Sequence, residues 1–176
     1  MAIPLFPLSV VLFPEGPLPL RIFETRYVDM VRRCMRGDQS FGVVLETAEV
    51  GTMAKIVDFH QLSDGFLGLS CVGEQRFRIM SRERQADGLN LAGIEMLEPE
   101  VLTAVPERHT RLAHLLKSVL PQLGEGYAGI KMRLDDAAWV GHRLAEILPI
   151  PTARKQFCLE LADPVERLDF LSPMAT

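Results

Sequence analysis

The hydrophobic pattern of the chain changes near residues 99–106, and this change constrains the fold more than any other feature. Before it, short apolar runs alternate with turn signals, which is typical of strands. After it, apolar residues recur at the spacing of amphipathic helices. We therefore predict an α+β protein, with a β-rich subdomain over residues 1–100 and a helical subdomain over residues 101–176.

The first half is expected to form a compact, barrel-like sheet with one early helix. Strand-like runs cover residues 3–13, 40–45, 52–62, 67–72, 75–80 and 89–97. Between two of these runs, Asp64-Gly65 suits a two-residue type I′ turn, because both central residues need positive φ. The helix is predicted over Glu24–Arg36, where one apolar stripe is formed by Tyr27, Met30, Val31, Cys34 and Met35.

The second half is expected to form a small helical bundle. An apolar stripe over residues 112–120 predicts a helix that ends at Pro121. Asp135 or Asp136 is well placed to cap a second helix, and a short helix is expected around Phe157. Asp163-Pro164 then combines an N-cap with a proline at the first helical position, which predicts a last helix.

The chain is expected to be soluble and cytoplasmic. Residues 2–20 are almost entirely apolar, but they cannot form a membrane-spanning helix, because prolines interrupt them five times. No basic stretch precedes them, as a signal peptide requires. The three cysteines contain no C-x-x-C pair, which fits a reducing compartment and predicts neither disulfides nor a cysteine zinc site. A net charge of −4 argues against a general binder of nucleic-acid backbones.

The sequence contains no strong catalytic signal. The best candidate is a triad on the hairpin: a two-residue turn would place His60 opposite Leu69 and Asp58 opposite Cys71, so that the three groups could cluster. The alternative is that Cys71 is a small buried residue, since a mid-strand position offers no electropositive field to activate it.

Metal and nucleotide sites are not expected either. His109 and His114 are five residues apart, so they cannot share a helix face, and all four histidines are expected at the surface or at caps. Neither of the glycine-rich nucleotide-binding motifs occurs. We therefore assign no catalytic residue, no metal and no cofactor, and expect a protein that is not an enzyme.

Three apolar residues are candidates for an exposed peptide-binding surface: Phe66 at the hairpin tip, and Phe13 and Leu18 beside the turn at residues 14–17. Exposed apolar patches often mark partner sites. As a group, these residues favour a protein-binding module over an enzyme.

The order of motifs resembles the N-terminal, substrate-recognition domain of Lon proteases. The likeness begins with Pro4-Leu5-Phe6-Pro7-Leu8, Val11-Leu12-Phe13-Pro14 and the run from Pro19 to Tyr27. It continues through Phe41-Gly42-Val43-Val44, Val50-Gly51-Thr52, Ser63-Asp64-Gly65 and the run from Val72 to Ile79. It closes with Lys155-Gln156, Leu159-Glu160 and Glu166-Arg167-Leu168.

This resemblance implies a PUA-like β pseudobarrel followed by a helical bundle. It also implies a non-catalytic module that holds unfolded or tagged polypeptides, acting as an adaptor in protein quality control with a Lon-type protease as a partner. Because the sequence ends at Thr176, we expect a stand-alone form without the ATPase and protease domains. A weak homo-oligomer is also expected.

The family-like residues are expected to build the fold. Pro7, Pro14 and Pro19 would fix the path of the chain by restricting φ. Phe23 and Tyr27, four residues apart, would anchor the first helix onto the sheet. Glu24 or Arg26 would pair with Arg76 or Asp64.

Two binding functions remain open from the sequence. The leading hypothesis is an apolar groove between the two halves that takes extended peptide, with a strand added at a sheet edge. The alternative, prompted by the PUA-like architecture, is nucleic-acid binding through a basic run on one strand face, formed by Arg76, Arg78, Arg82 and Arg84.

Overall fold

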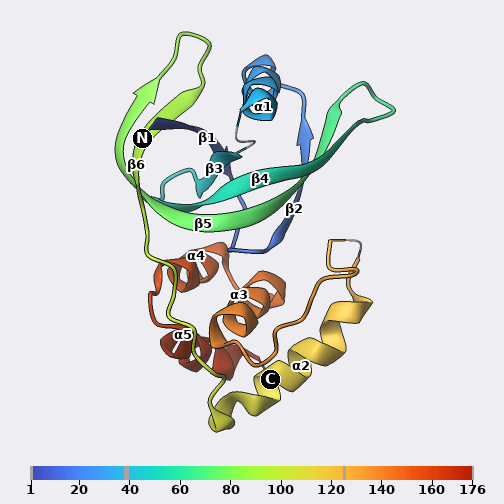
Figure 1. The fold of residues 1–176 in the computed structure, drawn as a ribbon, viewed down its shortest axis with the longest axis vertical. Coiled ribbons are helices and arrows are strands. Elements are labelled where there is room, and N and C mark those ends of the chain that lie inside the picture. Colours follow the sequence, from blue (N-terminus) through green and yellow to red (C-terminus); the bar gives the residue numbers. More distant parts are fainter. Residues whose placement is uncertain (1, 38–39, 125, 176) are drawn as a thin grey trace. The chain divides into compact units, whose positions relative to one another are not determined.

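The computed structural model describes residues 2–37, 40–124 and 126–175 and divides the chain into two compact units. We call Met1–Glu98 the β unit and Pro99–Thr176 the helical unit (Figure 1). The boundary expected from the sequence lies two residues further along the chain. Thr176, at which the printed sequence ends, lies outside the described residues.

The β unit contains a six-stranded sheet and one helix, α1 (Thr25–Arg36). The strands are β1 (Ala2–Leu8), β2 (Pro17–Ile22), β3 (Ser40–Leu45), β4 (Val50–Gln61), β5 (Leu67–Arg84) and β6 (Asn90–Met96). Their order is β2-β5-β4-β3-β1-β6, and β5 also pairs with β6. The sheet therefore curls back on itself without forming a regular barrel, because the long β5 pairs with β4 and β2 along its first part and with β6 along its second part.

The α+β class and the early helix are confirmed. Helix α1 begins one residue after the predicted start and ends at the predicted residue, Arg36. It packs on the sheet through a continuous apolar face, and its Tyr27 ring stacks on Phe6 with ring centroids 4.4 Å apart and an interplanar angle of 2°. A stacked pair of this kind adds about 0.5–1.5 kcal/mol beyond the burial of its area.

Three strand predictions are wrong. The strand predicted over residues 3–13 ends at Leu8. Residues 67–72 and 75–80 belong to one strand, β5. The glycine between them, Gly73, is a point of close backbone approach rather than a break: its N–H donates to Gly16, its carbonyl accepts from Glu15, and a Cβ there would lie 2.1 Å from the Phe13 carbonyl oxygen. Strand β2 was not predicted, because it contains two prolines, which are unusual within strands. They are tolerated here because β2 lies at the edge of the sheet.

The hairpin turn also differs from the prediction. Leu62 N–H donates to Phe66 at 2.7 Å and Gly65 N–H donates to Leu62 at 2.9 Å, so the loop has three residues. Gly65 has a φ of 86°, the left-handed conformation that such a loop requires at its last position. The register consequently places His60 opposite Gly68 and not opposite Leu69.

The helical unit follows the predicted pattern. Its helices are α2 (Thr110–Val119), α3 (Ala137–Ile147), α4 (Thr152–Glu160) and α5 (Pro164–Leu171), with short 3₁₀ turns at Glu107–His109, Leu120–Gln122 and Ser172–Met174. Asp136 and Asp163 are the N-caps of α3 and α5, and each carboxylate accepts two backbone N–H groups. Helix α3 lies at the centre of the unit, with Trp139 and Val140 fully or almost fully buried.

Candidate functional site

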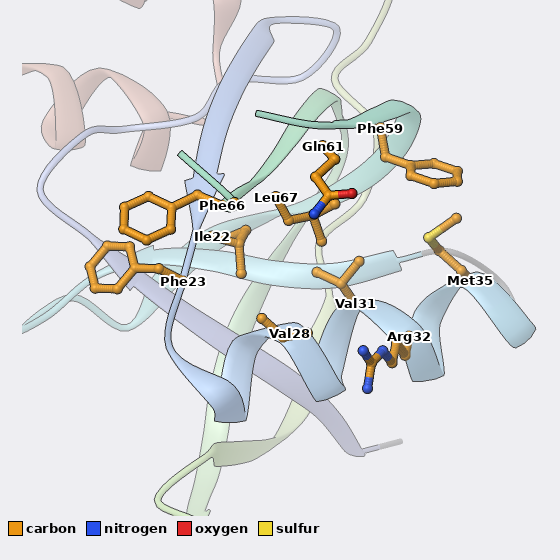
Figure 2. A pocket seen from close by; sticks show the side chains of 11 residues that line it. Ile22, Phe23, Val28, Val31, Arg32, Met35, Phe59, Gln61, Phe66 and Leu67 are labelled. Atoms are coloured by element: carbon orange, nitrogen blue, oxygen red, sulfur yellow. The ribbon is translucent and has the colours of Figure 1, made fainter. Parts of the chain in front are cut away.

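The β unit contains an apolar groove of about 450 Å³ between α1 and the β4–β5 hairpin (Figure 2). We call it the α1 groove. Helix α1 supplies its floor, the hairpin its opposite wall, and the end of β2 one rim. Its lining consists of Ile22, Phe23, Val28, Val31, Arg32, Met35, Phe59, Gln61, Gly65, Phe66 and Leu67.

Aromatic rings stand at both ends of the α1 groove. At one end, Phe23 is 62% exposed and stacks on Phe66 with centroids 5.1 Å apart. The Arg21 guanidinium lies over the Phe66 ring at 4.7 Å and pairs with Asp64, which holds the hairpin tip against the end of β2. At the other end, Phe59 is 52% exposed and lies near Met35. Large apolar side chains this exposed around a concave surface make the α1 groove a candidate binding site.

The predicted peptide-binding residues fall in different places. Phe66 lines the α1 groove, and its role in peptide binding stays a prediction. The expected exposure of Phe13 and Leu18 is wrong: their exposed fractions are 0% and 8%. Phe13 is covered because the turn after it folds over Gly73, and Leu18 points into the core from β2, where it lies opposite Cys71.

Phe23 was expected to anchor the helix, and this too is wrong. The helix begins after it, at Thr25, so the i,i+4 spacing to Tyr27 does not place the two side chains on one helix face. Tyr27 is the anchor, as predicted, and Phe23 is left at the groove rim. The sequence contained a signal for this position: Phe23 precedes Glu24, the N-cap residue, and therefore lies outside the helix.

The other family-like residues have local roles. Arg26 donates to the Gly88 carbonyl at 2.9 Å and pairs with Glu24 at 3.3 Å, so the predicted pairing of these two residues with Arg76 or Asp64 is wrong. Pro7 and Pro19 lie within β1 and β2. Pro14 opens a turn whose next residue, Glu15, has a φ of 64°.

The basic run predicted on one strand face is not a continuous surface. Arg76 is 6% exposed, so it cannot present its charge to a phosphate backbone. Arg82 donates to the Ala48 carbonyl at 2.7 Å and lies 3.8 Å from Glu49.

The hairpin triad does not form. Cys71 lies opposite Ile56 because a bulge interrupts the register of β4, and Asp58 lies opposite Ser70. Burial raises the pKa of the Cys71 thiol to about 12, so it is no nucleophile at neutral pH. Asp58 accepts from the Phe59 N–H and is exposed. The alternative, a small buried residue, describes Cys71 correctly.

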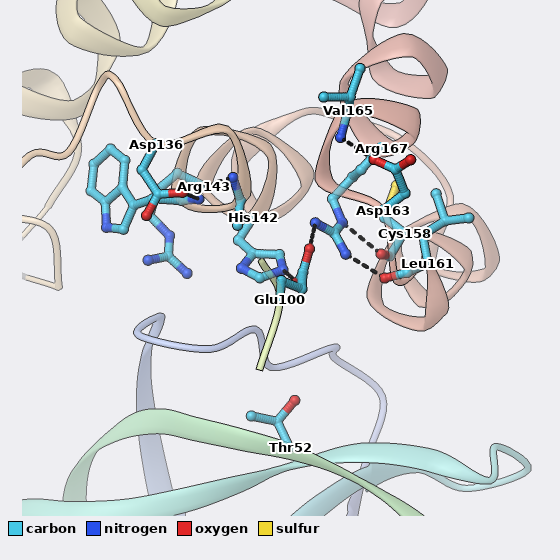
Figure 3. A network of polar contacts seen from close by, with 12 residues as sticks. Thr52, Glu100, Asp136, His142, Arg143, Cys158, Leu161, Asp163, Val165 and Arg167 are labelled. Atoms are coloured by element: carbon cyan, nitrogen blue, oxygen red, sulfur yellow. Dashed lines mark hydrogen bonds and ion pairs between the residues drawn. The ribbon is translucent and has the colours of Figure 1, made fainter. Parts of the chain in front are cut away.

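A buried ionic network in the helical unit was missed by sequence reasoning. Glu100 accepts from Arg167 Nη1 at 2.6 Å and lies 2.9 Å from His142 Nε2 (Figure 3). Arg167 also donates to the carbonyls of Cys158 and Leu161. We call Glu100, His142 and Arg167 the Glu100 network. Its side chains are at most 6% exposed, so the network is internal to the helical unit and cannot reach a ligand.

The Glu100 network has strongly shifted pKa values. Burial alone would raise the pKa of Glu100, but the hydrogen bonds and charge of its two partners outweigh burial and lower that pKa to about 2. Burial, helped by the charge of Arg167, lowers the pKa of His142 to about 3. Neutral His142 thus lies against the carboxylate as a polar neighbour, and Arg167 contributes the compensating charge.

His142 departs from the surface or cap position expected for it, since it is 4% exposed within the Glu100 network. His109 is at a cap, as the N-cap residue of α2, but it is only 4% exposed, with its Nε2 2.6 Å from Asp169. Among residues 2–37, 40–124 and 126–175, no group of three or more His, Cys, Asp or Glu side chains is arranged to hold a metal ion. In the same ranges, no helix has both the length and the apolar character needed to cross a bilayer.

A curled six-stranded sheet with one early helix, followed by a helical unit, defines the class of Lon N-terminal domains. The chain superposes on the crystal structure of a Lon N-terminal domain protein from Xanthomonas campestris with a TM-score of 0.85 and 37% identity, covering 98% of both chains. It also has the fold of the N-terminal domain of the Mycobacterium avium complex Lon protease, with a TM-score of 0.70 and 15% identity over 99% of this chain and 98% of that one.

The family model described as the ATP-dependent protease La (LON) substrate-binding domain matches residues 2–175. The chain therefore belongs to the Lon substrate-binding domain family. Curated relatives include protein cereblon from Gallus gallus, 27% identical over 72% of this chain, and from Xenopus tropicalis, 31% identical over 57%. The matched region spans only 32% and 25% of those two relatives.

Proposed function

We propose that the chain is a non-catalytic module that binds polypeptide segments in the α1 groove. The observation that carries this proposal is the half-exposed Phe23–Phe66 stack at the rim of an apolar groove, in a member of a substrate-binding domain family. Unfolded polypeptides expose apolar side chains that such a groove can bury, and folded proteins largely do not.

The expected affinity is modest. One apolar side chain that becomes buried contributes about 1.5–3 kcal/mol. A groove of this size accommodates two or three of them, and association entropy offsets part of the gain. We therefore expect dissociation constants between roughly 1 μM and 1 mM. A module of this kind would need further contacts or an assembled partner to hold a substrate for long.

The wider role is also a proposal. We propose that the chain works in the cytoplasm as an adaptor in protein quality control, presenting unfolded or tagged polypeptides to a Lon-type protease. The likeness to substrate-binding domains supports this role, and the α1 groove supplies a surface for it. The predicted groove between the two halves and the predicted weak homo-oligomer stay predictions.

Fluorescence anisotropy with a labelled, permanently unfolded protein tests the binding function. The probe is reduced and carboxymethylated α-lactalbumin, with native α-lactalbumin as the folded control. Phe23→Asp should weaken binding about 10- to 100-fold, because it removes one aromatic contact and adds a charge at the groove. Met80→Asp is the matched control, since Met80 is also 62% exposed in the β unit but does not line the groove. Equal affinities for the two variants would refute the location, and no binding of the unfolded probe by the unsubstituted protein would refute the function.

A further inference from the structure

Strand β4 extends well beyond the strand that flanks it. The pairing of β3 with β4 runs from Val43 opposite Thr52 to Ser40 opposite Lys55. On its other side, β4 stays paired with β5 as far as Gln61. Within the described part of the chain, no strand pairs with residues 56–61 on the side of β3. This stretch is an open sheet edge, and two of its residues, Phe59 and Gln61, also line the α1 groove.

The hydrogen bonds of the hairpin determine which backbone groups lie along this edge. Leu62 N–H donates to Phe66, so the backbone groups of Leu62 point toward β5. Because these directions alternate along an antiparallel strand, those of His60 also point toward β5, and those of Phe59 and Gln61 point outward. The Phe59 N–H agrees with this assignment, since it donates to the Asp58 side chain at 2.9 Å instead of to a strand.

This edge lacks the protection that the other open edge has. Strand β2 carries Pro17 and Pro19, which have no N–H to offer a further strand. The β4 edge instead carries Val57 and Phe59, which are 56% and 52% exposed. An exposed apolar edge without proline is a template for pairing with another chain.

Charged side chains of both signs lie beside this edge. Asp58 lies on the edge itself, where it accepts from the Phe59 N–H, and Arg32 lies across the groove on α1. Arg32 is the charged residue in the lining of the α1 groove, and its ion pair with Asp29 is long, at 3.8 Å, and exposed. Such a pair contributes little to stability and leaves Arg32 able to pair with an acidic side chain.

We propose that the bound polypeptide is an extended segment that adds a strand to the outer edge of β4 at residues 57–61, with alternate apolar side chains in the α1 groove and an acidic side chain beside Arg32. Backbone pairing is independent of side-chain identity, so it suits a site that must accept many sequences. The acidic residue supplies orientation, because only one strand direction brings it to Arg32. This inference rests on the proposed function and names its mode of binding.

Backbone N-methylation of a short peptide tests strand addition directly. The probe is a labelled peptide of about eight residues, long enough to cover the roughly 17 Å of this edge, with alternating Val and Thr and one terminal Glu. One variant carries N-methyl groups on the odd residues and another on the even residues. Because only one of these sets faces the protein, we expect one methylated peptide to lose at least about tenfold in affinity and the other to bind unchanged.

The outcomes separate the two proposals. If both methylated peptides bind like the parent, side chains alone hold the peptide: strand addition is wrong and the proposed function stands. If neither the peptides nor the unfolded probe bind, the proposed function itself is wrong. Replacing the terminal Glu by Lys should weaken binding to the unsubstituted protein and strengthen it to Arg32→Glu, and no such reversal would refute the acidic contact. If sedimentation shows a dimer that Val57→Lys dissociates, the edge holds a second copy of this chain and the proposed occupant is wrong.

Discussion

Replacing Glu100 by glutamine should destabilise the helical unit by about 3–5 kcal/mol. The change removes the carboxylate that accepts from Arg167 Nη1 at 2.6 Å and lies 2.9 Å from His142 Nε2. Glutamine fills nearly the same space, but its side-chain NH₂ is a donor where the carboxylate had a second acceptor oxygen. This NH₂ must therefore face either Arg167 Nη1 or His142 Nε2, which are themselves donors. The guanidinium, whose side chain is 0% exposed, is left without its counter-ion. Breaking a buried ion pair from one side costs about 3–5 kcal/mol.

The expected loss is a large part of the stability of an ordinary domain, which is about 5–15 kcal/mol. At about 2–4 °C per kcal/mol for a chain of this size, the melting temperature should fall by roughly 6–20 °C. The chain has a single tryptophan, Trp139, which is 2% exposed in the helical unit. Its fluorescence during urea unfolding therefore reports the unit in which the change is made.

Two further variants make this test specific. Arg108→Gln removes one of the partners of Asp169, in a half-exposed pair of the same unit, and it should cost at most about 1 kcal/mol. The double variant Glu100→Gln with Arg167→Met should lose less than the sum of its single variants, because no buried charge remains unpaired. If Glu100→Gln costs no more than Arg108→Gln, the Glu100 network does not behave as a buried ion pair and the reasoning is refuted.

Three other predictions concern titration, thiol reactivity and a turn. The pKa of His142 lies near 3 in the folded chain. Below about pH 6.5 the unfolded chain therefore binds a proton at this histidine and the folded chain does not. The stability from this source is fully present above pH 6.5 and is lost as pH falls toward 3. His142→Gln should therefore flatten the fall of the urea midpoint between pH 6.5 and pH 5, and an unchanged slope would contradict the assignment. The three thiols, all buried, should resist iodoacetamide near pH 8 until urea is added, as mass spectrometry can check, and alkylation of the native protein would show that the burial is wrong. Gly65→Ala should lower the free energy of unfolding by about 1 kcal/mol, because Gly65 has a φ of 86°. Gly124→Ala is the control, since Gly124 is equally free of neighbours and has no positive φ, and it should cost less. Equal urea midpoints for the two variants would count against the three-residue turn.

The parts of the fold that could be predicted depend on neighbours in sequence. Helix α1 was found to within one residue because its apolar stripe repeats every three to four positions. The cap of α5, Asp163, could be predicted, and that of α3 could be narrowed to Asp135 or Asp136, because a cap acts on N–H groups two or three residues away. The order of motifs resembles that of Lon N-terminal domains and so indicates the family from the sequence alone.

The errors arose where distant segments meet. The sequence pattern divided β5 at Gly73 because a glycine in a strand looks like a break, whereas the turn after Phe13 crosses the strand there. The register of a hairpin changes when its turn is one residue longer or shorter. Here the turn has one residue more than predicted, so the expected pairing of His60 with Leu69 and of Asp58 with Cys71 does not occur. Phe23 was misplaced because its spacing to Tyr27 is helical only within a helix, and Phe23 lies before the first residue of α1.

The candidate site illustrates the same division. Phe66 could be selected from the sequence because a hairpin tip is exposed in almost any arrangement. The α1 groove could not, because its lining comes from β2, α1 and both strands of the hairpin, whose contact is decided by tertiary packing. The Glu100 network was equally hidden: its three residues lie far apart in sequence, and each alone reads as an ordinary surface charge or cap.

The sequence by itself determined the fold class, the order of a β-rich and a helical part, the approximate positions of the helices and the family. These properties follow from local periodicity, capping and motif order, which act over a few residues. Only the tertiary structure decided which apolar residues stay exposed, how the hairpin is registered, and where charges are buried. Those outcomes depend on which distant segments cover one another, because burial and ionic pairing are properties of the packed chain and not of any one segment.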